Sequence, residues 1–489
     1  MAERGERGHM GWSAGDVAAA TGGRLCGGGP DAWVAGVSTD SRRIAPGELF
    51  WALKGPRFDG HEFVGEALRR GAAGAVVQQD ACGAHPGPLP GGASRNVIIR
   101  VADTLRALGD FAAWHRRRIG LRVFGVTGSC GKTTTKDLVA AVLGRRWPTV
   151  ATRGNFNNLI GLPLTLLGAR PEDRWAVLEM GMNQPGEIRR LCEIAGPEAG
   201  LVTTVQPVHL EGLGDIEGVA AEKAALFAAL PASGVAVVNL DDPRVRAAAE
   251  GLACRRVTWS LAGAAGAEAR CRRWEPRKDG TLAVFDLAGT VLECRLRLVG
   301  VVNVANALAA AAAGLAVGVP AAEIRAALEA AAPAPGRLRL APLPGGRRLL
   351  DDTYNANPAS MRAALETLAR WAGDRPRVAI LGTMFELGAE AAAYHEALGA
   401  AAAAAGLSHL VAVGEFADRV ARGAGGMPCT ALESTEALLE WLPAHAAGLC
   451  PEGGFVLVKG SRGMGLERAA AGLAEALSGR RDLAGAGGR

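Results

Sequence analysis

One stretch near residue 130 constrains this chain more than any other. The apolar, β-forming residues 121–126 enter a loop of small residues, and Lys132 opens a segment whose apolar side chains fall on one helical face. A strand, a glycine-rich loop and a Lys-Thr pair at a helix start together predict a phosphate-binding loop. Backbone N–H groups, a helix N-terminus and a lysine all favour a bound anion. The strict pattern would place a glycine at Val126, so this loop is a variant.

The loop predicts an ATP site. The residues expected to contact the nucleotide are Gly128, Ser129, Cys130, Gly131, Lys132, Thr133 and Thr134. In such a loop the lysine reaches the β- and γ-phosphates, and the hydroxyl that follows it, here on Thr133, binds the accompanying Mg²⁺. A Gly-rich turn without function is the alternative. The strand before the loop and the helix after it argue against that alternative.

Size and composition indicate a soluble protein of several domains. The chain has 489 residues, of which 49% are hydrophobic and 21% charged, and such a length usually divides into about three domains. A net charge of +5 is small for this length, and only 5% of the residues are aromatic. Neither a basic patch nor a stacking surface for nucleic acid is therefore indicated, and we expect small-molecule substrates.

Cysteine spacing and hydropathy bear on the compartment. The 9 cysteines form no Cys-x-x-Cys pair, so neither a zinc ribbon nor a disulfide framework is indicated. Residues 1–10 lack the apolar core of a secretory signal, and the most apolar stretch, residues 307–319, is shorter than the roughly 20 residues that span a bilayer. The sequence predicts a cytoplasmic protein without a transmembrane segment.

The order of strand and helix patterns predicts an α/β fold with three domains. Residues 11–103 are typical of a small α/β domain, and residues 104–334 of a P-loop-type central ATPase domain with a parallel sheet. Residues 335–478 alternate between strand and helix patterns, which indicates a Rossmann-like α/β domain. A segment rich in proline at residues 332–337 separates the last two.

Polar side chains follow two predicted strands of the central domain. Glu179 ends one strand and His209 lies just past another, where open α/β sheets place ligand-binding groups. Glu179 is a candidate Mg²⁺ ligand, and the alternative is a glutamate that only ends an exposed strand. Lys223 lies on a later predicted helix, where its spacing alone favours a surface ion pair.

Two other polar groups leave alternatives open. Asn303 and Asn306 lie within one predicted helix, where asparagine is unfavourable, so either adenine or ribose contact or a hydrogen bond to a backbone carbonyl would explain them. The hydroxyl-rich loop at residues 38–42 ends in an arginine and suits a diphosphate or a uracil edge. A surface turn explains this loop equally well.

Ordered motifs resemble those of the Mur ligases, the ATP-dependent ligases of peptidoglycan precursor synthesis. The resemblance runs from Trp12 to about Ala470. Its motifs cover residues 38–42, 127–134, 155–158, 179–182, 209–212, 335–337, 352–358, 381–388 and 458–462. The Tyr-Asn-Ala-Asn-Pro box at residues 354–358 is the most specific and resembles the MurF type of the family. The Asp-Asn-Pro-Arg box of MurE relatives is missing from the corresponding region.

The resemblance implies a reaction with two small-molecule substrates. ATP would phosphorylate the terminal carboxylate of UDP-N-acetylmuramoyl-tripeptide, and the amine of D-alanyl-D-alanine would then attack the acyl phosphate. The implied cofactors are ATP and two Mg²⁺ ions. We expect the protein to act as a monomer.

The resemblance also implies roles for single residues. Catalytic roles are implied for Lys132, Glu179, His209 and Lys223. The implied metal ligands are Thr133, Glu179, His209 and Lys223, the last as a carbamylated lysine with an anionic oxygen. Further nucleotide contacts are implied for Asn306, Arg337 and Asp352. Substrate contacts are implied for Ser38, Thr39, Asp40, Ser41, Arg42, Asn157, Asn158, Asn355, Asn357 and Ser461.

The chain departs from the usual family pattern at a few positions, and two other readings stay open. The departures are Leu159, Thr204, Val301, Val302 and Thr383. One alternative is another Mur-like amide ligase, of the MurE or folylpolyglutamate synthetase kind, against which the box at residues 354–357 argues. The other is an inactive nucleotide-binding scaffold, against which the retained Lys132, Glu179 and His209 argue.

Overall fold

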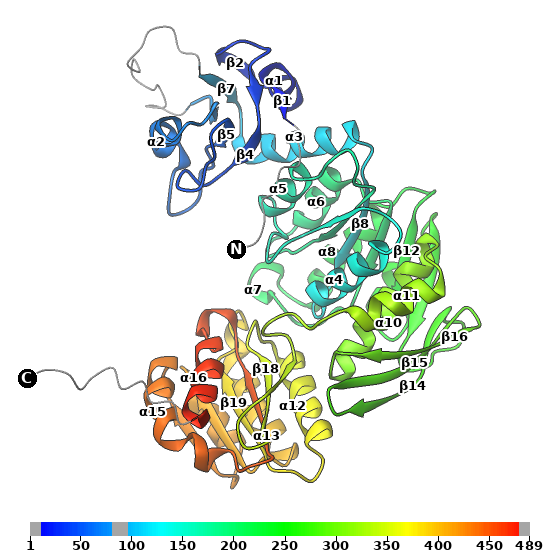
Figure 1. Ribbon diagram of the computed structural model, residues 1–489, viewed down its shortest axis with the longest axis vertical. Coiled ribbons are helices and arrows are strands. Elements are labelled where there is room, and N and C mark those ends of the chain that lie inside the picture. Colours follow the sequence, from blue (N-terminus) through cyan, green and yellow to red (C-terminus); the bar gives the residue numbers. More distant parts are fainter. Residues whose placement is uncertain (1–10, 81–95, 479–489) are drawn as a thin grey trace, which may run out of the picture.

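The computed structural model describes residues 11–80 and 96–478 and contains three large β-sheets with helices packed against them (Figure 1). It confirms the predicted α/β class with three units. The expectation that residues 1–10 hold no secretory signal lies outside the described residues. Within the described ranges, no helix is long and apolar enough to cross a membrane.

The first sheet has five strands and lies in the N-terminal unit. Its order is β2 (Arg24–Gly27), β7 (Val97–Val101), β6 (Gly74–Gln78), β5 (Glu48–Trp51) and β4 (Gly36–Ser38), with only β2 and β7 antiparallel. Successive side chains of β5 point to opposite faces of the sheet, so the strand contributes to the core on both sides. Leu49 and Trp51 pack with α1 (Ala14–Thr21) and α3 (Thr104–Arg118), whereas Phe50 packs with α2 (Val64–Arg69).

The second sheet has nine strands and follows the central part of the chain. Its order is β16 (Thr290–Leu296), β15 (Gly280–Leu287), β14 (Ala269–Arg277), β13 (Arg255–Ser260), β12 (Val235–Asn239), β11 (Ala199–Val202), β8 (Arg122–Thr127), β10 (Trp175–Glu179) and β9 (Thr149–Ala151). The pairs β14–β15 and β15–β16 are antiparallel, whereas β13 pairs in parallel with both neighbours.

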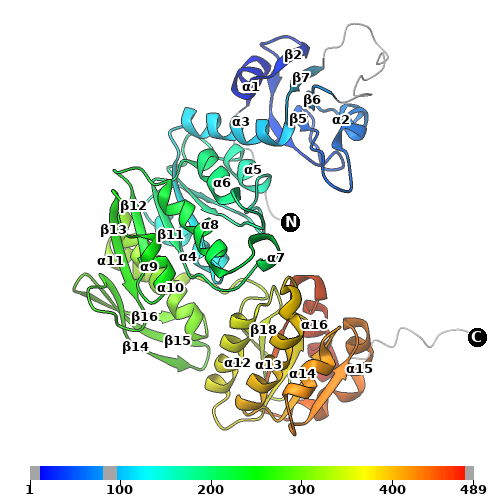
Figure 2. The same cartoon turned by 180° about the vertical axis from the view of Figure 1, so that it is seen from behind.

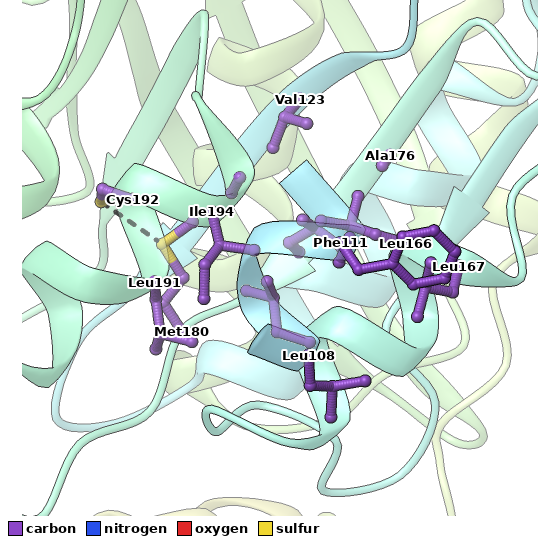
Figure 3. Packing of buried hydrophobic residues seen from close by; sticks show 14 of the residues in the cluster. Leu108, Phe111, Val123, Leu166, Leu167, Ala176, Met180, Leu191, Cys192 and Ile194 are labelled. Atoms are coloured by element: carbon purple, nitrogen blue, oxygen red, sulfur yellow. Dashed lines mark hydrogen bonds between the residues drawn. The ribbon is translucent and has the colours of Figure 1, made fainter. Parts of the chain in front are cut away.

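Helices cover both faces of the central sheet because its strands alternate buried side chains. Val123 of β8 faces a layer formed by α3, α5 (Gly161–Leu167), α6 (Glu187–Ala195) and α8 (Ile216–Ala228). Phe124 faces the opposite layer, formed by α4 (Lys132–Leu143), α10 (Val301–Val317) and α11 (Ala321–Ala330). Figure 3 shows the first layer, with Phe111 of α3 near Leu166 of α5.

The third sheet has six strands and forms the C-terminal unit. Its order is β17 (Arg339–Pro342), β18 (Arg348–Asp352), β22 (Phe455–Lys459), β19 (Arg377–Gly382), β20 (His409–Val413) and β21 (Cys429–Leu432). Only β17 is antiparallel to its neighbour, so the expected Rossmann-like arrangement is confirmed. The sequence gives only a weak strand pattern for β17 and β21, because each strand has four residues and is only partly buried.

The three units form an open arc, with the N-terminal and C-terminal units projecting from the same side of the central one (Figures 1 and 2). The β14–β15 hairpin of the central sheet lies along α12 (Pro358–Ala372) of the C-terminal unit. There Trp274 stacks on Trp371 with ring centroids 6.2 Å apart, and Arg370 lies 4.0 Å over the Trp274 ring. An ion pair of 3.0 Å joins Asp279 of the hairpin to Arg348. These contacts fix the C-terminal unit relative to the central sheet.

Candidate active site

The phosphate loop joins the end of β8 to the start of α4. Gly128 and Gly131 have φ values of 144° and 79°, in a region that favours glycine. A Cβ at Gly128 would collide with the Thr203 side chain, and one at Gly131 would collide with Asn306. The Lys132 amine donates a hydrogen bond of 2.8 Å to the Gly128 carbonyl, which holds the lysine along the loop. Burial lowers the Lys132 pKa, and the nearby Glu179 opposes this shift.

The loop opens into a cleft of about 430 Å³ between the central and C-terminal units, here called the central cleft. It brings together most of the predicted site residues. Those that line it are Ser129, Cys130, Gly131, Lys132, Thr133, Thr134, Asn157, Asn158, Glu179, His209, Lys223, Asn306, Arg337, Asp352, Asn355 and Asn357. The carboxyl ends of β10, β18 and β22 meet here, because parallel strands end at the same edge of each sheet.

Glu179 is buried at the carboxyl end of β10, with 2% of its surface exposed. Its Oε1 accepts a hydrogen bond of 2.8 Å from Asn157. Its Oε2 is buried and has no hydrogen-bond partner. A buried carboxylate oxygen is costly to leave unpaired, so this oxygen fits a cation in the cleft. The alternative of a glutamate that ends an exposed strand is wrong, since the residue is buried.

We expect Glu179→Gln to weaken Mg²⁺ binding without impairing folding. The amide still accepts the Asn157 hydrogen bond but replaces the free anionic oxygen with a donor, which repels a cation. The Mg²⁺ concentration for half-maximal ATP hydrolysis should rise about 10- to 100-fold. A titration of activity with Mg²⁺ measures this shift. An unchanged Mg²⁺ requirement would contradict the assignment.

Arg337 connects the C-terminal unit to the phosphate loop. Its Nη2 donates a hydrogen bond of 2.9 Å to the Thr133 hydroxyl, which is the group expected to bind Mg²⁺. The same guanidinium lies 3.9 Å from the centre of the Tyr354 ring, a cation–π geometry. Thr133 Oγ1 keeps one lone pair for a further partner, because a hydroxyl oxygen can accept two hydrogen bonds and Arg337 supplies only one.

Asp352 forms a buried ion pair at the floor of the cleft. Its Oδ2 lies 2.6 Å from the amine of Lys459, and its Oδ1 accepts a hydrogen bond from the Leu338 N–H. The Lys459 amine also donates to the Asn355 carbonyl at 2.9 Å. The pair therefore orders the backbone of residues 352–355 along the cleft.

The two asparagines of α10 bond within the protein. Asn303 donates a hydrogen bond of 2.9 Å to the Val299 carbonyl. This is the backbone hydrogen bond that was one of the two explanations for an asparagine within this helix. Asn306 donates to Asn303 and accepts a hydrogen bond of 3.2 Å from Thr135 of α4. Asn306 thus lies directly against the phosphate loop, at the position where it would collide with a Cβ on Gly131.

Lys223 lies on α8 and lines the cleft, with 2% of its surface exposed. The surface ion pair that its spacing favours is therefore not found. Burial holds its pKa well below the usual value, and the positive charge of Lys132 lowers it further. The neighbouring Glu222 accepts hydrogen bonds from the Gly186 and Ile188 N–H groups instead.

His209 lies at the start of α7 (Leu210–Leu213) with a φ of 54°. Its Nδ1 lies 2.8 Å from Oε2 of Glu386, a residue of the C-terminal unit. Burial lowers the His209 pKa, Glu386 opposes this shift, and Lys132 and Lys223 add to it. With Nδ1 engaged, Nε2 is the ring nitrogen left for a ligand in the cleft.

Some predicted residues have structural partners. Asn158 accepts hydrogen bonds from the Ile160 and Gly161 N–H groups, and Asn357 caps α12 through a capping box with Ser360. Both still line the cleft. Ser461 is not among the lining residues and accepts a hydrogen bond from the Phe385 N–H.

The predicted loop for the UDP end lies in the N-terminal unit. Ser38, Thr39, Asp40, Ser41 and Arg42 are not among the residues that line the central cleft. Arg42 pairs with Asp40 through two hydrogen bonds of 2.9 Å, and this pairing lowers the Asp40 pKa. Whether the loop binds a diphosphate stays a prediction.

Other residues that line the cleft were not predicted as site residues, among them Tyr354, Lys459 and Arg462. Lys459 ends β22 at the same edge of its sheet as Asp352. The rule that selected Glu179, a charged residue at the carboxyl end of a parallel strand, would also have selected Lys459. The stacking of Arg337 and Arg462 near Tyr354 has no such local signal.

Family models and a curated relative match most of the chain. Family models match residues 34–116 (Mur ligase family, catalytic domain), 126–314 (Mur ligase middle domain) and 336–462 (Mur ligase, glutamate ligase domain). A UDP-N-acetylmuramoyl-tripeptide–D-alanyl-D-alanine ligase of Escherichia coli is 37% identical over 91% of this chain and 95% of its own length.

Solved structures agree with the sequence matches. A crystal structure of MurF from Acinetobacter baumannii has a TM-score of 0.86 and 33% identity, and covers 95% of this chain and 99% of its own. MurF ligase from Thermotoga maritima in complex with ADP has a TM-score of 0.78 and 26% identity, and covers 91% and 98%. The architecture, the phosphate loop and these matches together establish that the chain belongs to the Mur ligase family.

Proposed function

We propose that this protein is an ATP-dependent ligase that joins D-alanyl-D-alanine to UDP-N-acetylmuramoyl-tripeptide, a step of peptidoglycan precursor synthesis. The observation that carries the proposal is the central cleft, which is lined both by the phosphate loop and by residues 354–357 of the Tyr-Asn-Ala-Asn-Pro box. Relatives that cover nearly the whole chain bear the name of this activity. We also propose that the enzyme acts in the cytoplasm and as a monomer.

The chemistry requires activation of a carboxylate. A carboxylate oxygen of the tripeptide attacks the γ-phosphorus of ATP, and ADP leaves, which yields an acyl phosphate. The amine nitrogen of D-alanyl-D-alanine attacks the acyl carbon, loses a proton, and phosphate leaves with the formation of the amide bond. Negative charge gathers on the phosphoryl oxygens, so positioned cations contribute most of the stabilisation.

The residues of the cleft fit these demands. Lys132 follows the loop and supplies a cation for the β- and γ-phosphates. Arg337 reaches the loop from the C-terminal unit and adds a second cation beside Thr133. Asp352 and Lys459 order the backbone at Asn355, where the incoming amine would bind. Closure of the two units over the cleft would also exclude water from the acyl phosphate.

The donor set of the cleft fits Mg²⁺. Glu179 would hold it through its unpaired Oε2, and Thr133 would hold it through its hydroxyl beside the phosphates. The ion would neutralise charge on the phosphates when bound. Within residues 11–80 and 96–478, no group of three or more His, Cys, Asp and Glu side chains forms a ready-made metal site, so the nucleotide and other donors must complete the coordination.

Lys223 is our proposed source of a further anionic donor. A lysine amine reacts with CO₂ only when it is neutral, and burial beside Lys132 favours the neutral form at Lys223. The resulting carbamate would replace an uncompensated buried amine with an anionic oxygen near the loop lysine. His209 would then hold a second ion through Nε2, opposite its contact with Glu386.

The direct test is phosphate release from ATP with each substrate alone and with both. We expect release only when UDP-N-acetylmuramoyl-tripeptide and D-alanyl-D-alanine are both present, with a UDP-linked pentapeptide of the matching mass. Mg²⁺ and bicarbonate are supplied throughout. Release that requires neither substrate, or a product with glutamate in place of the dipeptide, would contradict the proposal.

A further inference from the structure

The segment at residues 383–388 contains a sequence motif but none of the predicted site residues. It follows β19 in the C-terminal unit and lies against residues 209–212 of the central unit, where Gly388 approaches the Glu211 side chain. Glu386 is its one side chain that reaches a residue of the central cleft by an ion pair, with 2.8 Å between Oε2 and His209 Nδ1.

Two side-chain acceptors of the C-terminal unit hold the backbone of this segment. The Met384 N–H donates to Nε2 of His395 at 2.9 Å, and the Phe385 N–H donates to the Ser461 hydroxyl at 2.9 Å. His395 is fully buried and its Nδ1 lies 2.7 Å from the Ala391 carbonyl, so its ring is fixed as an acceptor for Met384. Two consecutive amides are thus anchored immediately before Glu386.

Both partners of the ion pair have left-handed backbones. The φ values are 54° at His209 and 62° at Glu386, in a region that non-glycine residues seldom adopt and that is found preferentially at functional sites. Glu386 is also largely exposed, at 58% of its side-chain surface, and an exposed ion pair contributes little to stability. Stability alone therefore gives little reason for a glutamate in this conformation.

We propose that Glu386 is a positioning residue that orients His209 and makes its orientation depend on the arrangement of the C-terminal unit. The carboxylate accepts a hydrogen bond from Nδ1–H, which fixes the ring with Nε2 toward the cleft, as carboxylates do for metal-binding histidines. Because the carboxylate comes from another unit, His209 is oriented only while the two units have this arrangement. This inference rests on the proposed role of His209.

The test compares variants at Glu386 with a nearby control. Glu386→Ala should lower kcat about 10- to 100-fold while KM for ATP stays within about twofold. Glu386→Gln keeps an acceptor oxygen and should retain more activity. Glu386→Gly should lose as much activity as Glu386→Ala and yet be the more stable of the two, because glycine adopts positive φ freely. The control Glu390→Ala changes an exposed glutamate two residues beyond the segment and should match the wild type.

Two readouts separate orientation from a structural role. In a His209→Ala background, Glu386→Ala should cause no further loss, since the residue acts through the histidine. Histidine-ring NMR signals of His209, identified by their absence in His209→Ala, should shift in Glu386→Ala and not in Glu390→Ala. Additive losses or unshifted ring signals would overturn the inference. The ring signals need no substrate, so they decide this point even if the proposed reaction is not observed.

Discussion

Lys132→Ala should lower the kcat of ATP-dependent ligation on the order of 10³-fold. The amine lies along the phosphate loop through its hydrogen bond to the Gly128 carbonyl, and alanine removes the one lysine of that loop. The charge that develops on the γ-phosphoryl oxygens would then lose the cation supplied by the loop itself, and Arg337 from the other unit and the metal ion would not replace it at that position. Single-turnover phosphate release with saturating substrates measures the loss of chemistry separately from the loss of binding.

The matched control for this variant is Arg145→Ala. Arg145 is an exposed cation just after α4, at the opposite end of that helix from Lys132. Its removal changes the net charge equally but leaves the cleft untouched, so kcat should stay within about twofold of wild type. Equal losses for the two variants would show that charge alone, and not its position, accounts for the effect.

Lys223→Met should have opposite effects on activity and stability. Activity should fall between about 10²- and 10³-fold, because the proposed carbamate and its anionic oxygen cannot form. The unfolding free energy in bicarbonate-free buffer should instead rise by about 1–3 kcal/mol, because methionine has a similar length and removes a buried amine. Phosphate release and denaturant unfolding measure the two effects.

The pH dependence of this stabilisation has a definite sign. Burial lowers the Lys223 pKa in the folded state, whereas an unfolded lysine keeps a value of about 10.4. The unfolded chain therefore binds the proton more tightly, and this residue destabilises the wild type as the pH falls below that value. The advantage of Lys223→Met should be present at neutral pH and shrink as the pH approaches about 10. An advantage that grows with pH would contradict the assignment.

Local sequence patterns were sufficient for most of the buried strands and for one side of the site. The phosphate loop is specified by glycines that need positive φ and by the strand and helix around it, all within about twenty residues. Glu179 could be selected because the ends of parallel strands share one edge of a sheet, so its position in the fold follows from the strand order. The family motifs then predicted further site residues along the rest of the chain.

Local patterns did not reveal which polar side chains were already engaged. Asn158 and Asn357 both line the cleft. Asn158 also accepts hydrogen bonds from two backbone N–H groups just before and at the start of α5, Asn357 caps α12, and the Ser461 hydroxyl holds the Phe385 amide. An asparagine before a helix is equally suited to a cap and to a ligand contact, since both use the same amide oxygen. Only the hydrogen-bond partners in the structure distinguish the two uses.

The sequence by itself determined the α/β class, the phosphate loop and the family of this protein, because these depend on spacing within single elements and on ordered motifs. The tertiary structure alone decided how the units meet. Arg337 contacts Thr133 although 204 residues separate them in the sequence, and Glu386 of the C-terminal unit contacts His209 of the central unit. Such contacts depend on the packing of one unit against another, here through the Trp274–Trp371 stack as well as the cleft. No periodicity along the chain encodes that placement.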